Sequence, residues 1–404
     1  MDYQETLAYL YARLPMYQRI GKAAYKADLS NTWALMDVLE HPERELKCVH
    51  VAGTNGKGST AHMVASILQE AGYKVGLHTS PHLKDFRERF RLNGRMIGED
   101  VVVRFVERYR SGFEPVQASF FEWGVGLALW WFREEEVDIA VIETGMGGRL
   151  DSTNVVGPEV SVITSIGLDH AEFLGRTEEA IATEKAGIIK QGVPVVVGEV
   201  KDSVSEVIRA RAREKQAAFI LVDSTMPLPG PLDLAGAHQL RNARTACTVA
   251  DTLTTWGWSI PPEAIRLGLS RVVRNTGLMG RWQVLNERPM IVADVAHNRD
   301  GFRVVSEQLG TSEFERLHIV LGVVNDKDLS ALRELPKEAT YYFCKADIPR
   351  GLEVEELKRQ AAAFGLKGTA HPSVAAALLA SRSCSGPDDL ILITGSVFVV
   401  AEVI

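Results

Sequence analysis

The sequence predicts a two-domain α/β protein in which each domain contains a mostly parallel sheet. A chain of 404 residues is too long for a single hydrophobic core, which favours two domains. Short β-rich runs alternate along the chain with longer helical patterns. Several of these runs are apolar on both faces, which is typical of parallel strands that helices cover on both sides.

The elements of the first domain follow one another along the chain. Apolar runs of strand length predict strands at residues 49–53, 74–80, 138–145, 160–167 and 193–199. Longer patterns predict helices at residues 59–71, 121–132, 177–190 and about 239–256. Ligands in open α/β sheets bind beyond the carboxyl ends of the strands, so we expect the functional residues directly after these runs.

A second α/β series begins after the sequence changes character at residues 277–281. Its predicted strands lie at residues 290–297, 317–324, 339–346 and 390–395. We therefore place a domain boundary near residue 282, with one domain at 1–281 and a smaller, Rossmann-like α/β domain at 282–404.

The composition is that of an ordinary globular protein, with 46% hydrophobic and 24% charged residues. The net charge of -7 gives no general attraction to nucleic acid or anionic membrane, although a local basic pocket is compatible with it. The four scattered cysteines include no C-x-x-C pair, which argues against a zinc site or a disulfide framework. The N-terminus lacks the pattern of a signal peptide, and the apolar run 124–132 is too short to span a bilayer. We expect a cytoplasmic protein.

The stretch "HVAGTNGKGST" at residues 50–60 departs by one position from the phosphate-binding pattern G-x-x-x-x-G-K-[ST]. Lys57 is followed by Gly58, and the hydroxyl residues come one position late. A strand, a glycine-rich turn and a helix still provide backbone N–H groups and a helix dipole for an anion. The alternative is a tight turn that needs glycine only for its backbone angles. The combination favours a P-loop ATPase-like domain that binds ATP through Thr54, Asn55, Gly56, Lys57, Gly58, Ser59 and Thr60.

Glu143 ends a predicted strand inside an apolar run. A carboxylate in such a place is costly unless it is paired or bound to a cation. It could form a salt bridge or cap a helix, or it could bind Mg²⁺ beside the ATP phosphates, since Mg²⁺ prefers oxygen ligands. His170 follows the next predicted strand, although a lone histidine is usually structural.

Nine further motifs follow one another along the chain: "TSPHLKDFRERFRLNG" (79–94), "FFEWGVGLA" (120–128), "IETGMGGRLDSTNV" (142–155), "SIGLDHAEFLG" (165–175), "EKAGIIK" (184–190), "GAHQLRNA" (236–243), "ADVAHN" (293–298), "NDKD" (325–328) and "TGSVF" (394–398). In this order they resemble the folylpolyglutamate synthase/dihydrofolate synthase members of the Mur ligase family of ATP-dependent amide-bond formers. The resemblance runs nearly from end to end of the chain.

The resemblance implies two Mg²⁺ ions. Ser80 and Glu143 would hold one, with Ser59 beside it, and Glu143 and His170 would hold the second. Lys185 would join the second site as a carbamate, because that modification turns a cation into an oxygen donor. The alternative is an unmodified lysine that pairs with a carboxylate or a phosphate.

The resemblance also assigns nucleotide contacts outside the loop. Asn242 would contact adenine. Arg281, at the presumed domain junction, would contact a phosphate when the domains close, and Asp294 and His297 would face ATP from the second domain. The family usually has proline before the Gly-Arg pair, whereas this chain has Met279. The linker is therefore expected to be less rigid.

Substrate contacts are expected in three places. Asp151 and Asn154 lie in a glycine-rich loop that would line the folate site, unless it is only a flexible loop. Phe121 and Glu122 resemble positions near the pterin and aminobenzoate, although an aromatic residue on a buried helix is more often core. A dihydropteroate pocket would include Ala27, Asp28 and Leu29; the alternative is a packing helix with a polar loop.

The implied reaction is ATP-dependent ligation of L-glutamate to dihydropteroate, to the γ-carboxylate of a reduced folate, or to both, through an acyl phosphate. Lys57, Lys185 and His297 are the expected catalytic residues, and small molecules are the expected partners of a monomer. One rival is a cell-wall ligase, but such enzymes usually carry an N-terminal domain for which there is no room before residue 53. A nucleotide-switch protein is the other, although it would not need the Asp294–His297 site or the metal residues.

Overall fold

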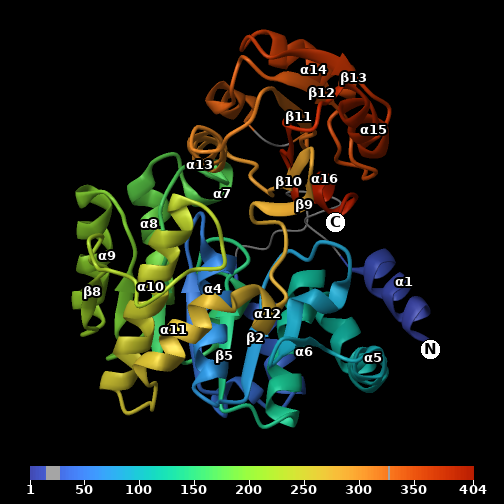
Figure 1. Ribbon diagram of the computed structural model, residues 1–404. Helices are drawn as coiled ribbons and strands as arrows, with labels where there is room; N and C mark the ends of the chain where they lie inside the picture. Colours follow the sequence, from blue (N-terminus) through green and yellow to red (C-terminus); the bar gives the residue numbers. More distant parts are fainter. Residues whose placement is uncertain (15–27, 326–327) are drawn as a thin grey trace. The chain divides into compact units, whose positions relative to one another are not determined.

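The computed structural model describes residues 1–14, 28–325 and 328–404 (Figure 1). The chain forms two compact units. The first comprises Met1–Asp233 and His238–Leu278, and the second comprises Leu234–Ala237 and Met279–Ile404. Within the described part of the chain, no helix is long and apolar enough to cross a membrane.

The described residues of the first unit contain an eight-stranded sheet in the order β4-β3-β2-β5-β1-β6-β7-β8. Its strands are β1 (Cys48–Ala52), β2 (Val75–His78), β3 (Phe90–Leu92), β4 (Arg95–Met96), β5 (Ile139–Glu143), β6 (Val160–Ile163), β7 (Val195–Val197) and β8 (Phe219–Leu221). Strands β2, β5, β1, β6, β7 and β8, in this order, pair in parallel. Strands β3 and β4 extend the sheet beyond β2 as an antiparallel edge. The central strands β1, β2, β5 and β6 are buried along their whole length, which explains why apolar runs predicted them.

Helices of the first unit pack around this sheet. They are α1 (Tyr3–Arg13), α3 (Ser30–Val38), α4 (Lys57–Glu70), α5 (Glu99–Phe113), α6 (Phe120–Glu134), α7 (Ala171–Leu174), α8 (Glu178–Lys185), α9 (Asp202–Glu214), α10 (Ala237–Thr255), α11 (Pro262–Ser270) and α12 (Val272–Thr276). The helix predicted at 177–190 is shorter in the structure, because the chain tightens to a 3₁₀ turn at Ala186–Ile188.

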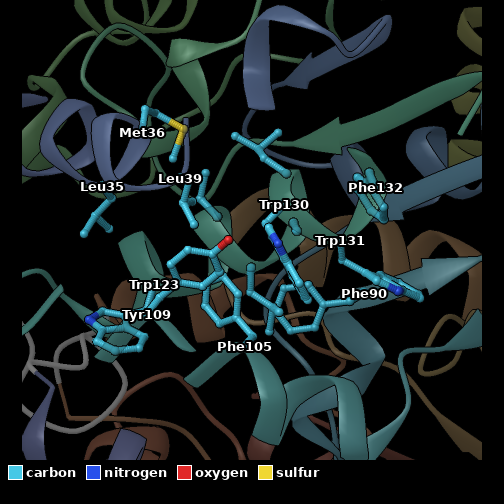
Figure 2. Close-up of a cluster of buried hydrophobic side chains, with 14 of the residues drawn as sticks. Leu35, Met36, Leu39, Phe90, Phe105, Tyr109, Trp123, Trp130, Trp131 and Phe132 are labelled. Carbon is cyan, nitrogen blue, oxygen red and sulfur yellow. The ribbon is translucent and has the colours of Figure 1, made fainter. Parts of the chain in front are cut away.

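An aromatic core lies between α6 and its neighbours (Figure 2). Phe105 packs against Trp130 with ring centroids 5.1 Å apart, and Phe113 meets the edge of Trp123 at 4.7 Å. Such edge-to-face and tilted pairs stabilise beyond the area that they bury. Helix α6 begins with a capping box between Ser119 and Glu122, so its start is fixed by sequence as well as by packing.

The described residues of the second unit contain a six-stranded sheet in the order β13-β12-β11-β14-β10-β9. The strands are β9 (Gln283–Glu287), β10 (Met290–Ala293), β11 (Leu317–Leu321), β12 (Thr340–Phe343), β13 (Lys367–Ala370) and β14 (Leu390–Thr394). All neighbours pair in parallel except β9 and β10, which form an antiparallel pair. Its helices are α13 (Arg299–Leu309), α14 (Val354–Ala362), α15 (Val374–Cys384) and α16 (Val397–Ala401). The two sheets confirm the predicted fold class.

Candidate active site

The glycine-rich loop joins β1 to α4, and two of its glycines are required by geometry. Gly53 has φ +154°, and a Cβ there would lie 1.9 Å from Thr164 Oγ1. Gly56 has φ +82°, and a Cβ there would lie 2.3 Å from Asn242 Oδ1. A larger residue at Gly56 would therefore strain the backbone and collide with the predicted adenine contact.

The segment after β6 fastens this loop. The Thr54 N–H donates to the Ser165 carbonyl at 2.8 Å, and the Thr164 hydroxyl donates to the Asn55 carbonyl at 2.7 Å. The Gly167 N–H donates to Thr54 Oγ1 at 3.0 Å. These three hydrogen bonds hold the loop against the segment that follows β6.

Two lysines donate hydrogen bonds to backbone carbonyls of the loop. Lys57 Nζ donates to the Thr54 carbonyl at 3.2 Å, and Lys185 Nζ donates to the Gly53 carbonyl at 2.8 Å. Lys185 is only 3% exposed. Burial, and then the charge of Lys57, lowers the pKa of Lys185 to about 7. A large fraction of this amine is therefore neutral, and so nucleophilic, near physiological pH.

Glu143 and Ser80 meet at the ends of adjacent parallel strands. Glu143 ends β5 and is 4% exposed, and β5 pairs with β2. The Ser80 N–H, two residues beyond β2, donates to Glu143 Oε2 at 3.0 Å. Sequence order alone does not show this contact, because it depends on β2 and β5 being neighbours in the sheet.

His170 follows β6 with a left-handed backbone, φ +51°. Its N–H donates to Asp169 Oδ1 at 2.8 Å, and its Nε2 lies 4.0 Å from the same oxygen. Asp169 also acts on Lys185, whose pKa its charge raises against the effect of burial. Our reading of the sequence missed Asp169, and its position directly before His170 in "GLDH" was the available signal.

The predicted metal residues do not form a complete cage. Among the described residues, no group of three or more His, Cys, Asp or Glu side chains could hold a metal ion. The Glu143 carboxylate and the Ser80 and Ser59 hydroxyls are nevertheless hard oxygen donors. Mg²⁺ is often bound by one or two such groups with substrate phosphates and water completing its shell. The residues present therefore fit Mg²⁺ that arrives with a nucleotide.

Asp151 and Asn154 stabilise the loop that follows Glu143. Asp151 accepts the Met146 N–H at 2.8 Å and the Thr153 hydroxyl at 2.6 Å. The Asn154 amide donates to the carbonyls of Arg149 and Gly187 at 3.0 and 3.2 Å. Both side chains have a structural task, and their contact with a substrate stays a prediction.

Phe121 is partly buried on α6 and lies over the same loop. A Cβ on Gly145 would come within 2.6 Å of the Phe121 ring, so glycine is needed for this approach. Glu122 is buried and accepts the Ser119 N–H at 2.6 Å, which makes it a helix cap. Asp28 accepts the Ser30 N–H at 2.9 Å, and Leu29 precedes α3. Ala27 lies outside the described residues.

The second unit contains its own polar cluster at the carboxyl end of β10. Asp294 is 5% exposed and accepts the N–H groups of Trp282 and Ala296 at 2.8 and 2.9 Å. These bonds tie the chain beside Arg281 to the chain before His297, whose Nδ1 lies 2.9 Å from the Val295 carbonyl. Burial raises the pKa of Asp294, and the Arg281 charge opposes this effect. Asp294 thus positions the other two predicted residues.

A phosphate loop whose glycines are required by geometry, a lysine in its helix and a carboxylate on the adjacent strand define a P-loop nucleotide-binding protein. Comparison with known families specifies the class. The Mur ligase middle domain matches residues 51–226, and the glutamate ligase domain of Mur ligases matches residues 280–397. The chain belongs to the Mur ligase family, and within it to the folylpolyglutamate synthases and dihydrofolate synthases.

The folylpolyglutamate synthase of Lacticaseibacillus casei is 32% identical over 100% of this chain and 98% of its own length. A probable bifunctional folylpolyglutamate synthase/dihydropteroate synthase of Haloferax volcanii is 36% identical, but this chain spans only about half (50%) of that longer protein. The structure of E. coli FolC in complex with DHPP and ADP is similar over 100% of this chain and 97% of that one, with a TM-score of 0.87 and 31% identity. A bifunctional folylpolyglutamate synthase/dihydrofolate synthase with Mn, AMPPNP and L-glutamate bound has a TM-score of 0.86 and 29% identity over 100% and 97% of the two chains.

Proposed function

We propose that this protein joins L-glutamate both to dihydropteroate and to the γ-carboxylate of reduced folates, using ATP. One observation carries the proposal: Lys57 and Lys185 both lie on carbonyls of a rigid phosphate loop, in a chain that matches glutamate-adding ligases along its whole length. The DHPP and ADP complex of one relative, and the L-glutamate complex of another, support the choice of substrates.

The chemistry requires that a carboxylate be activated. A carboxylate is a poor electrophile because its leaving group would be oxide. An oxygen of the acceptor carboxylate attacks the γ-phosphorus of ATP, the bond to the β-phosphate oxygen breaks, and ADP leaves with the electron pair. The amine of glutamate then attacks the acyl carbon, and phosphate leaves. Lys57 offsets the charge of the phosphoryl group during the transfer.

Two Mg²⁺ ions complete the proposed site. Ser80 and Glu143, with Ser59 nearby, would hold one, and Glu143, His170 and a carbamylated Lys185 would hold the other. The ions supply charge neutralisation on the phosphoryl oxygens. The support for carbamylation is the low pKa of Lys185, because only a neutral amine adds CO₂. Asp169 accepts the backbone N–H of His170 and so helps to fix the backbone that carries the imidazole.

Residues 282–404 are proposed to be the glutamate-ligase domain, and residues 1–281 the ATP- and folate-binding domain. Arg281, Asp294 and His297 would act on the phosphoryl groups and on the incoming amine, and Asn242 would contact adenine. Asp151, Asn154, Phe121, Glu122, Asp28 and Leu29 are proposed to line the folate site. A cytoplasmic monomer without nucleic-acid or membrane partners is the expected form.

A substrate panel tests the proposal. Dihydropteroate and tetrahydrofolate are each incubated with ATP, Mg²⁺ and glutamate, and the products are analysed by mass. We expect both acceptors to gain one glutamyl residue, with ADP formed only when glutamate and an acceptor are both present. ADP formation without glutamate or acceptor would indicate a switch-type hydrolase, and use of tetrahydrofolate alone would leave a polyglutamate synthase.

A further inference from the structure

Among the described residues, Arg89 has no carboxylate within ion-pair distance. It is 5% exposed and ends a 3₁₀ turn, Phe86–Arg89, just before β3. Its Nε donates to His82 Nδ1 at 2.8 Å. Neither terminal nitrogen of the guanidinium has an acceptor among the described residues, and no carboxylate among them forms an ion pair with it. Of the undescribed residues, the segment 15–27 contains no Asp or Glu in its sequence, and the segment 326–327 contains Asp326.

The two carboxylates whose charges act on Arg89 already accept hydrogen bonds from backbone N–H groups. Glu88 accepts the N–H groups of Leu83 and Asp85 at 2.7 and 2.9 Å, and Glu143 accepts the Ser80 N–H. Burial lowers the pKa of Arg89 to about 10, and Tyr11, followed by Glu143 and Glu88, opposes this effect. A buried charge is costly unless it is paired, so an uncompensated guanidinium indicates an anion that binds here from outside the chain.

The backbone places Arg89 at the edge of the candidate metal site. The Arg89 carbonyl accepts the Thr79 N–H at 3.2 Å and faces His78 Nδ1 at 3.1 Å. Thr79 directly precedes Ser80, whose N–H contacts Glu143. The Arg89 guanidinium also lies over the Phe120 ring, with its Cζ 5.4 Å from the ring centroid. The guanidinium therefore packs on an aromatic face, and its charge interacts with Glu143, one of the proposed Mg²⁺ ligands.

His82 provides a second hydrogen-bond donor beside the Arg89 guanidinium. Because the Arg89 Nε–H donates to His82 Nδ1, the proton of the neutral imidazole is on Nε2. The guanidinium fork and the imidazole N–H together match the two oxygens of a carboxylate.

We propose that Arg89, with His82 beside it, binds the acceptor carboxylate that is to be phosphorylated, an inference that rests on the proposed function. This carboxylate must approach ATP phosphates of the same charge, and a buried guanidinium offsets that repulsion. The paired N–H donors of the planar guanidinium would also fix the plane of the carboxylate. One carboxylate oxygen would then be directed at the γ-phosphorus.

The test compares dihydropteroate with its carboxamide, which keeps the shape and loses the charge. Binding of each is measured to wild type, Arg89→Met, Arg89→Lys and the matched control Arg87→Met. Arg87 lies two residues earlier and is already paired with Asp85 and Glu99 at 2.6 and 3.2 Å. We expect wild type and the control to prefer the acid by about 10- to 100-fold, as for a hydrogen-bonded charge. Arg89→Met should bind acid and amide equally, and Arg89→Lys should retain part of the preference, with ATP affinity unchanged in all variants.

Thermal denaturation without ligands separates binding from a structural role. Replacing an uncompensated buried cation by a residue of similar volume should leave the melting temperature unchanged or higher. A marked fall in the Arg89→Met melting temperature, or an acid preference equal to that of wild type, would overturn the inference. If wild type performs the ligation while this preference persists in Arg89→Met, only the role of Arg89 is wrong. Wild type that neither binds dihydropteroate nor ligates it overturns the proposed function as well.

Discussion

We expect Lys185→Met to raise the free energy of unfolding at pH 7, and this gain should shrink as the pH rises, because Lys185 is buried. Lys185 is 3% exposed, and its amine donates to the Gly53 carbonyl. Its pKa falls from the ordinary 10.5 to about 7 in the folded protein. The folded state therefore binds this proton less tightly than the unfolded state does, so the protonated lysine destabilises the fold.

The sign and size follow from proton linkage. The cost is fully present below the folded pKa of about 7 and disappears as the pH rises toward the unfolded value of 10.5. One pKa unit corresponds to about 1.4 kcal/mol, so the full shift corresponds to at most about 5 kcal/mol. The lost hydrogen bond to Gly53 removes roughly 1 kcal/mol from the benefit of the substitution. At pH 7 we expect the variant to be more stable than wild type by a few kcal/mol.

Urea denaturation between pH 7 and pH 9.5 in CO₂-depleted buffer measures this difference. The advantage of the variant should shrink by about 1 kcal/mol per pH unit, because other titrating groups are common to both proteins. Adding bicarbonate should stabilise wild type alone if Lys185 becomes carbamylated. A difference in stability that stays constant with pH would refute the low pKa, whatever happens to activity.

Three further results are expected. Glu143→Gln keeps the shape but removes the charge, so the Mg²⁺ concentration for half-maximal activity should rise about tenfold or more; an unchanged Mg²⁺ titration would contradict the assignment. Lys57→Ala should lower turnover about 10²- to 10³-fold with an unchanged melting temperature, whereas near-normal ligation would show that the loop has been misread. Scrambling residues 26–30 should reduce the reaction with dihydropteroate much more than the polyglutamate reaction; equal loss in a folded protein would argue against a separate pocket.

The fold was predictable where burial is complete and less so at the edges of the sheets. The central strands β1, β5 and β6 are apolar on both faces, and their runs stand out in the sequence. The short strands β4 and β8 are exposed or half-exposed and carry no such pattern. β9 was also not predicted, because its residues alternate only weakly between the two faces.

The candidate site was predictable as a set of residues but not as a set of contacts. Each residue could be placed after a strand, yet the Ser80–Glu143 bond depends on which strands are neighbours. The structural roles of Asp151 and Glu122 were also not predicted. Their carboxylates bind nearby backbone N–H groups, and a polar residue at a loop or helix start carries the same signal for capping as for ligand binding.

The late hydroxyl of the phosphate loop has a structural consequence that can be measured. Helix α4 begins at Lys57, so Gly58 occupies the position where the usual loop carries Ser or Thr. Ser59 is rotated about 100° farther around the helix, and it is buried. A loop without a hydroxyl next to its lysine needs another oxygen donor for Mg²⁺. Ser80 is suited to this role because its N–H is held by Glu143. We therefore expect Ser80→Ala to raise the Mg²⁺ concentration for half-maximal ligation more than Ser59→Ala does, at equal melting temperatures. The opposite order would show that Ser59 provides the oxygen despite its displacement.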